Sequence, residues 1–153
     1  MITGEFSAVR VFARPLSDVW RGYSDPALRK RWRSIPGSRG TFSVDFRPGG
    51  RELAEGTFAP SGTDETIRSM TEFLDIVDGE RIVLASSLRV DDVLRWASLV
   101  TLVFRGEDLT TSVTHTEQYT FLAYDGDGAN DEAHLRGSLN LQWNRFELAL
   151  DQR

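Results

Sequence analysis

The chain has no cysteine, a single lysine and no long apolar run, and each absence removes a class of function. Without cysteine there are no disulfides, no thiol catalysis and no cysteine-based zinc or iron–sulfur site. Lys30 is the one candidate for Schiff-base chemistry, but it lies in a charged cluster rather than in an apolar pocket that would activate it. No apolar segment approaches the ~20 residues that span a membrane.

Acidic residues outnumber basic ones by 23 to 18, and the resulting net charge of −5 argues against non-specific nucleic-acid binding. The first ten residues lack a basic region followed by an apolar core, so we expect no signal peptide and a cytoplasmic location. A length of 153 residues suits one domain. We therefore expect residues 1–153 to form a single domain, as a monomer or a homodimer.

The most informative segment runs from Leu109 to Phe121 and alternates without a break. Its even positions, 110 to 120, are all small or polar, so they form the wet face of a β-strand. The odd positions place His115, Glu117 and Tyr119 on the covered face among apolar neighbours. Polar groups on a covered face need partners or a cavity, so this strand indicates a ligand-binding architecture.

The rest of the chain predicts two short helices, further antiparallel strands and one long helix. Pro15 opens the first helix, and Asp25-Pro26 caps and starts the second. We expect strands at residues 6–14, 42–47, 51–58, 66–77, 81–90 and 94–105. From about residue 131 the period becomes helical, with apolar residues at Leu135, Leu139, Trp143, Phe146 and Leu150.

Such a helix can bury its apolar stripe only across the concave face of a curved sheet. The predicted fold class is therefore α+β: a helix-grip fold in which about six or seven antiparallel strands wrap around a long C-terminal helix. Two short helices follow the first strand, and a cavity can lie between the sheet and the long helix.

Several motifs in the first 126 residues match a known family. The hairpin Asp45-Phe-Arg-Pro-Gly-Gly-Arg-Glu52 resembles the D-x-R-x-G-G-R-E hairpin of bacterial proteins in the SRPBCC superfamily, which includes START domains and the birch-pollen allergen. The subfamily is the one related to the activator of the 90-kDa heat-shock-protein ATPase. Further matching pieces are Val19-Trp20, Asp25-Pro26, Arg31-Trp32, Asp75-Ile76-Val77, Glu80-Arg81-Ile82-Val83, Thr116-Glu117-Gln118, Phe121 and Tyr124-Asp125.

The resemblance implies a helix-grip fold and a cavity under the C-terminal helix. Relatives bind lipids, plant hormones or polyketides, some close aromatic polyketide rings, and relatives of the chaperone activator contact a chaperone. The C-terminal helix departs from the family pattern, because Gly137 is followed by Ser138 where members commonly have Trp, and residue 78 is Asp where many have Pro. These departures bear on the shape of the cavity.

His115 and Glu117 are the candidate catalytic pair, because side chains two apart on a strand lie ~7 Å from each other. A covered histidine beside a carboxylate can act as a general base. The pair can equally hold the strand against the helix, and we favour this structural interpretation because ion pairs also occur in interiors. Tyr119 could bind a ligand oxygen or reach the mouth of the cavity.

The four tryptophans point to an aromatic lining, although any one of them can be plain core. The predicted ligand-binding residues are Trp20, Trp32, Trp96, His115, Glu117, Tyr119, Leu139 and Trp143. The basic segment 29–33 could attract an anionic ligand, but we expect the solvated face of a short helix with only Trp32 buried. Asp45, Arg47 and Arg51 are expected to brace their hairpin as ion pairs of modest energy.

No metal or cofactor is predicted. His115, His134 and Glu117 could supply two histidines and a carboxylate, but they lack metal-ligand spacing. Asp125-Gly-Asp-Gly128 fails the calcium-loop register, since Arg136 stands where the twelfth-position Glu is needed. Residues 37–40 lack the Lys and Ser/Thr of a phosphate loop.

Three functions follow from these patterns. The leading one is binding of a small apolar or aromatic molecule in the cavity. The second is a polyketide cyclase-like or hydrolase-like enzyme that uses His115 and Glu117. The third is an interaction module that resembles the chaperone activator, which would need an exposed apolar patch.

Overall fold

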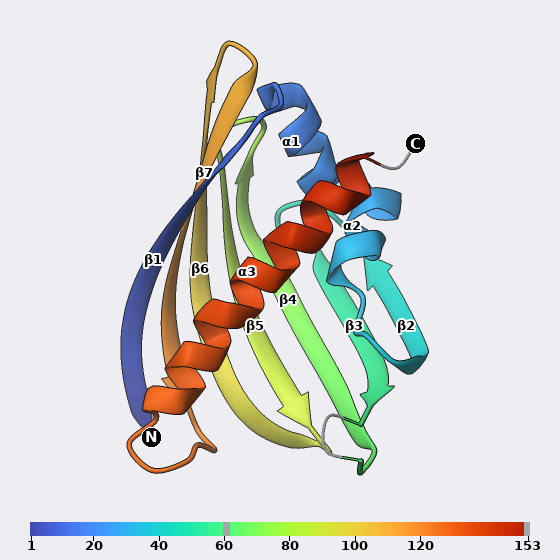
Figure 1. Cartoon of the computed structure of the whole chain (residues 1–153), viewed down its shortest axis with the longest axis vertical. Helices are drawn as coiled ribbons and strands as arrows, with labels where there is room; N and C mark the ends of the chain where they lie inside the picture. The colour runs from blue at the N-terminus through green and yellow to red at the C-terminus, as the bar shows by residue number, and fades with distance from the viewer. Residues whose placement is uncertain (60–61, 152–153) are drawn as a thin grey trace.

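A computed structural model describes residues 1–59 and 62–151, and the side chains of residues 38 and 39 are outside that description. Within it, seven antiparallel strands form one curved sheet in the order β1-β7-β6-β5-β4-β3-β2, and a long helix crosses the concave face (Figure 1). Along the chain the elements are β1 (Ile2–Phe12), α1 (Leu16–Ser24), α2 (Pro26–Arg33), β2 (Ser38–Val44), β3 (Arg51–Phe58), β4 (Glu65–Val77), β5 (Arg81–Val90), β6 (Val93–Glu107), β7 (Thr110–Phe121) and α3 (Ala129–Asp151). The predicted α+β helix-grip fold is confirmed.

Strand β7 has the predicted alternation over most of its length. Thr111, Val113, Glu117, Tyr119 and Phe121 are buried, and they face the side of the sheet that α3 covers. β7 pairs with β1 on one side and β6 on the other, which places it inside the sheet. The register in which the odd residues face the helix is therefore confirmed.

Leu109 is the exception to this pattern. It was expected to face inward, but it is 74% exposed. Glu107 pairs directly with Thr110, so residues 108 and 109 form the two-residue turn between β6 and β7. Asp108 has a φ of 54°, typical of a tight hairpin turn, and the inward face therefore begins only at Thr111.

Strands β1 and β2 differ from the prediction at both ends. β1 spans Ile2–Phe12 instead of residues 6–14, because it pairs with β7 as far as Phe121, and β2 spans Ser38–Val44 instead of residues 42–47. Residues 45–50 form a compact turn in which the Gly50 N–H donates to the Arg47 carbonyl (2.8 Å). A Cβ on Gly50 would lie 2.0 Å from the Asp45 carbonyl oxygen, so only glycine fits there.

The two short helices close one end of the sheet and reach α3 (Figure 1). Asp25 caps α2, since its Oδ1 accepts from the Ala27 N–H (2.8 Å) and the Leu28 N–H (3.1 Å). On α1, Gly22 lies so close to α3 that a Cβ there would be 2.4 Å from the Phe146 ring. Both short helices are thereby held against the C-terminal half of α3.

Helix α3 supplies its predicted stripe to the core. Its buried apolar residues include Leu135, Leu139, Trp143, Phe146 and Leu150, as predicted. Burial of each large side chain stabilises the fold by roughly 1.5–3 kcal/mol. Among residues 1–59 and 62–151, no helix is both long enough and apolar enough to cross a membrane.

Candidate ligand-binding site

Two adjacent cavities lie between α3 and the sheet, and we call them the inner chamber and the outer groove. The inner chamber has a volume of about 90 Å³ and is lined by Tyr23, Arg29, Trp32, Arg33, Leu84, Ser86, Trp96, Val100, Leu102, His115, Glu117, Leu135, Ser138, Leu139, Gln142 and Trp143. The outer groove has a volume of about 370 Å³ and is lined by Arg33, Ile35, Ile67, Ser69, Leu88, Val90, Arg95, Trp96, Phe121, Ala123, Asp131, His134, Leu135, Ser138 and Gln142. The five residues that line both form the junction: Arg33, Trp96, Leu135, Ser138 and Gln142.

One polar cluster at the inner chamber consists of His115 and Glu117, which line it, and Ser98, which contacts Glu117. His115 Nε2 lies 2.8 Å from Glu117 Oε1, and the Ser98 hydroxyl donates to Glu117 Oε2 at 2.6 Å. The imidazole stacks on Phe6 and lies nearly perpendicular to the Trp143 ring, with ring centroids 6.1 and 6.2 Å apart. The carboxylate is therefore held by two donors, while both its own side chain and the imidazole reach the chamber.

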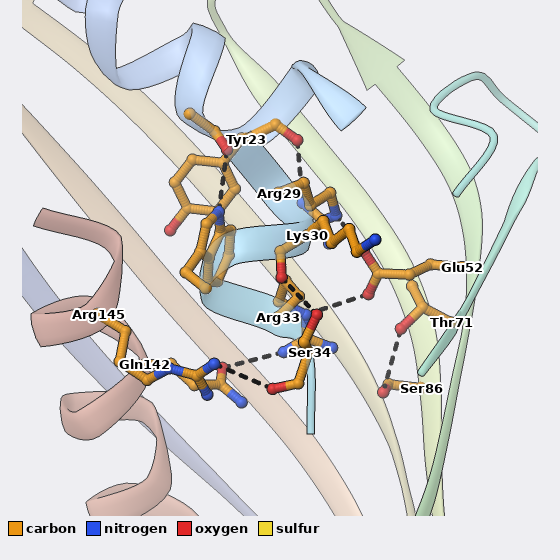
Figure 2. Close-up of polar contacts among 12 residues, drawn as sticks. Tyr23, Arg29, Lys30, Arg33, Ser34, Glu52, Thr71, Ser86, Gln142 and Arg145 are labelled. Carbon is orange, nitrogen blue, oxygen red and sulfur yellow. Dashed lines mark hydrogen bonds and ion pairs between the residues drawn. The ribbon is translucent and has the colours of Figure 1, made fainter. Parts of the chain in front are cut away.

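The second polar group is the Arg29–Arg33–Glu52 cluster (Figure 2). Arg29 Nε donates to one oxygen of Glu52, and Arg33 Nε donates to the other at 3.1 Å. Arg33 Nη1 also donates to Gln142 Oε1 of α3 at 3.0 Å, so the cluster ties α2 to both β3 and α3. The Arg29 guanidinium further lies 5.1 Å from the centre of the Phe73 ring.

The prediction that residues 29–33 form a solvated face with only Trp32 buried was wrong for Arg29. This side chain is as buried as Trp32, with 2% of the residue exposed. A buried arginine is tolerated because Glu52 and the Tyr23 carbonyl accept its hydrogen bonds. Lys30 fits the prediction: it is exposed and lies outside the residues that line the cavity.

These contacts shift several ionisation equilibria. Burial alone would raise the pKa of Glu52, but the charges and hydrogen bonds of Arg29 and Arg33 together lower it below its usual value. Burial lowers the pKa of Arg29, although Glu52 opposes this effect. Burial raises the pKa of Tyr23 to about 12, against the hydrogen bond that its hydroxyl accepts from the Trp143 indole N–H at 3.0 Å. The cluster is thus charged at neutral pH beside a neutral tyrosine.

The structure brings six of the eight predicted ligand-binding residues to the inner chamber. These are Trp32, Trp96, His115, Glu117, Leu139 and Trp143. Trp20 lies elsewhere, packed against Phe104 (ring centroids 4.9 Å apart) and Phe46 (6.1 Å).

Tyr119 lies outside both the inner chamber and the outer groove. Its hydroxyl donates to Glu132 Oε2 of α3 at 2.8 Å. Burial, and then this hydrogen bond, raise the pKa of Tyr119. The side chain therefore links the sheet to the beginning of α3.

The predicted ion-pair cluster in the hairpin forms only in part. Asp45 and Arg47 form an exposed ion pair with a distance of 2.7 Å, whereas Arg51 is exposed and forms no ion pair with any residue that the structure describes. In the loop 125–128, Asp127 Oδ1 accepts from the Ala129 N–H at 3.0 Å, so this segment caps α3. His134 lines the outer groove, whereas His115 lies in the inner chamber.

Several residues of the site were missed, although the sequence contains a signal for them. Ser98, which donates to Glu117 without lining either cavity, belongs to the same inward alternation as Trp96, Val100 and Leu102 in β6. Ser138 lies three residues and Gln142 seven residues after Leu135, on the face that carries the apolar stripe. Extension of the same periodicities to polar residues would have found these positions.

A comparison with known protein families identifies the relatives of this chain. The family described as Activator of Hsp90 ATPase homolog 1-like protein matches residues 13–151. The chain belongs to this family. The recognised resemblance is thereby confirmed for nearly the whole chain, including the helix that departs from the family pattern.

Solved structures of other proteins share this architecture. The crystal structure of the Mll3558 protein from Rhizobium loti is 29% identical, with a TM-score of 0.76, over 94% of this chain and 97% of that one. A protein from Rhizobium leguminosarum is 26% identical, with a TM-score of 0.77, over the full length of both chains. DynU16, a protein in the dynemicin biosynthetic locus, is 15% identical with a TM-score of 0.65; the match covers 97% of this chain and 47% of that one, and shows likeness of fold alone. No protein of curated function matches the sequence.

Proposed function

We propose that this protein binds a small hydrophobic or aromatic molecule in the inner chamber and outer groove, as a single cytoplasmic domain. The observation that carries the proposal is the pair of adjacent cavities that share Trp96, Leu135 and Ser138 in their lining. Membership in a fold family that generally binds hydrophobic ligands supports it. The inner chamber is too small for a complete lipid or polyketide, so the ligand must also occupy the outer groove.

Native mass spectrometry of protein purified from its own cells tests the proposal directly. We expect a small molecule that dissociates on unfolding. Ser138→Phe should exclude it, because this residue borders both parts of the cavity. Asn140→Phe is the matched control, since Asn140 is an exposed residue of the same helix. Equal occupancy of the two variants would contradict binding at the junction.

A second candidate is acid–base catalysis by His115 and Glu117. It is favoured by one observation: the hydrogen-bonded pair lines the inner chamber rather than the packed core. Loss of a general base lowers rates by roughly 10²–10⁴-fold. If the wild type converts the bound molecule and either His115→Ala or Glu117→Gln lowers the rate ~10²-fold, the enzyme interpretation holds. We expect instead that affinity changes within a few-fold and that no turnover occurs.

A further inference from the structure

The Arg29–Arg33–Glu52 cluster has unequal charge. Two guanidinium groups share one carboxylate, and the side chains of Arg29, Arg33 and Glu52 are only 3%, 14% and 1% exposed. The remaining partner, Gln142, is neutral. The cluster therefore carries one excess positive charge in a place where water screens it little.

Arg33 is the member of the cluster that borders both cavities. It lines the inner chamber and the outer groove, whereas Arg29 lines only the inner chamber and Glu52 lines neither. A guanidinium has five N–H groups. The bonds to Glu52 and Gln142 use one on Nε and one on Nη1, which leaves donors at the junction of the cavity.

The other charges around the cavity do not cancel this excess at Arg33. Glu117 lies on β7 and is held by Ser98 and His115, so its carboxylate repels an anion from that side of the inner chamber. In the outer groove, Arg95 and Asp131 have opposite charges. An anionic group on a ligand is therefore most stable at the junction, beside Arg33.

We infer that the ligand is an organic monoanion whose apolar or aromatic body carries one carboxylate-like acid group, and that Arg33 binds this group. The inference deepens the proposed function and rests on it. Carboxylate and sulfonate groups suit a guanidinium because they accept parallel hydrogen bonds. The body would extend along Trp96 and Leu135, with any hydrogen-bond donor directed to Glu117.

A matched pair of fluorescent probes tests the inference without knowledge of the natural ligand. 8-Anilinonaphthalene-1-sulfonate and N-phenyl-1-naphthylamine share one aromatic body, and only the first carries an anion. In Arg33→Gln we expect the affinity for the sulfonate probe to fall about tenfold or more, which corresponds to ~1.4 kcal/mol. The affinity for the neutral probe should change less than about threefold, because the body makes the same contacts. Arg47→Gln, at an exposed ion pair, should change neither affinity.

Gln142→Glu is a second variant that keeps Arg33 and its bond to Glu52. The new carboxylate would form an ion pair with the Arg33 guanidinium, at the position where Gln142 now accepts a hydrogen bond at 3.0 Å. It should therefore also lower the affinity for the sulfonate probe selectively. This variant adds a partner for the excess charge and keeps the test valid if Arg33→Gln fails to fold. Circular dichroism checks the fold of each variant.

The outcomes separate this inference from the proposed function. If both probes bind, Ser138→Phe excludes both, and neither charge variant discriminates between them, the cavity binds apolar molecules but the role of Arg33 is overturned. If neither probe binds, or Ser138→Phe leaves both affinities unchanged, the proposed function fails and the inference fails with it. Selective loss of the sulfonate probe in Arg33→Gln or Gln142→Glu supports the inference.

Discussion

Glu52 and Glu117 are two carboxylates buried to nearly the same degree, with 1% and 5% exposed, yet their surroundings differ. Glu52, on β3, accepts from two guanidinium groups and lines no part of the cavity. Glu117, on β7, accepts from the Ser98 hydroxyl and the His115 imidazole and lines the inner chamber. Three strands, β6, β5 and β4, separate them in the sheet.

The difference shows how one fold uses the same side chain in two ways. The partners of Glu52 are always charged and come from α2, so this carboxylate holds the helix to the sheet. The partners of Glu117 are a hydroxyl, which can rotate, and an imidazole, which can change its protonation state. In the proposed binding site Glu117 would therefore be free to exchange a partner for a ligand, whereas Glu52 cannot lose its partners without leaving two cations unpaired.

The largest expected effect is on stability in Glu52→Gln. The change leaves Arg29 buried without a charged partner, and removal of one member of a buried ion pair costs about 3–5 kcal/mol. Urea unfolding measures the loss. The control is Asp45→Asn, where the exposed pair with Arg47 should contribute ~0–1 kcal/mol. A loss as small as the control's would mean that Glu52 does not hold α2 to the sheet.

Glu52→Gln should also change how the unfolding free energy decreases at acidic pH. Because the folded state lowers the pKa of Glu52, the stabilisation is present above the unfolded value of 4.5 and is lost as pH falls below it. Glu52→Gln should therefore show a shallower decrease in unfolding free energy below about pH 4.5 than the wild type. Parallel acid limbs in the two proteins would contradict the assignment.

Trp143→Ala tests the contact between the two regions. The indole N–H donates to the Tyr23 hydroxyl, the Tyr23 carbonyl accepts from Arg29, and the indole ring lies nearly perpendicular to the His115 ring. Only 1% of Trp143 is exposed, so its truncation should cost ~3–5 kcal/mol in thermal or urea unfolding. Leu141→Ala, on the exposed side of α3, should cost under about 0.5 kcal/mol.

A smaller effect is expected from Tyr23 at alkaline pH. Its folded pKa of about 12 exceeds the unfolded value of 10.0, so its contribution is complete below pH 10 and is lost as pH rises toward 12. A shift of this size corresponds to roughly 2–3 kcal/mol. Tyr23→Phe should remove that part of the alkaline loss, as measured by unfolding from about pH 9 to about pH 12. An unchanged alkaline limb would show that Tyr23 ionises as readily in the fold as in the unfolded chain.

The smallest expected effect is the loss of stability in Glu117→Gln. Glu117→Gln keeps an acceptor for Ser98 and should cost about 1–2 kcal/mol, less than Glu52→Gln. Urea unfolding of the two variants under the same conditions gives the ranking. If Glu117→Gln were the more destabilising change, Glu117 would be the structural carboxylate and the two roles would be reversed.

The sequence predicted the Glu117 side of this comparison better than the Glu52 side. In a strand, every second side chain faces the same side of the sheet. The alternation of apolar and polar residues was therefore enough to place His115 and Glu117 against the helix. The same pattern failed at Leu109, because the turn type, and not hydrophobicity, decides where a hairpin strand begins. The long helix was predicted equally well, since its apolar stripe includes both Leu139 and Trp143.

Arg29 could not be placed in the same way. A short helix with four basic residues in a row of five is usually solvated, and the partner that permits burial, Glu52, is 23 residues away. Only the packing of α2 between β3 and α3 brings them together. Trp20 was placed wrongly for a different reason. The sequence predicts that this aromatic side chain faces the interior, but it does not show whether the side chain lines a cavity or, as here, packs against Phe46 and Phe104.

The pairing of β1 with β7 has a consequence for how the chain reaches this fold. Strand β1 leaves the ribosome ahead of the rest of the sheet, yet it pairs with a strand about 100 residues later, since Ile2 pairs with Phe121 and Phe12 with Thr111. Closure of so long a loop slows folding, and β1 must wait while the meander from β2 to β7 forms. Until then Phe6 and Phe12 have no core to enter. We therefore expect the β1 edge of the sheet to form last, and the apolar side chains of β1 to be open to aggregation until it does.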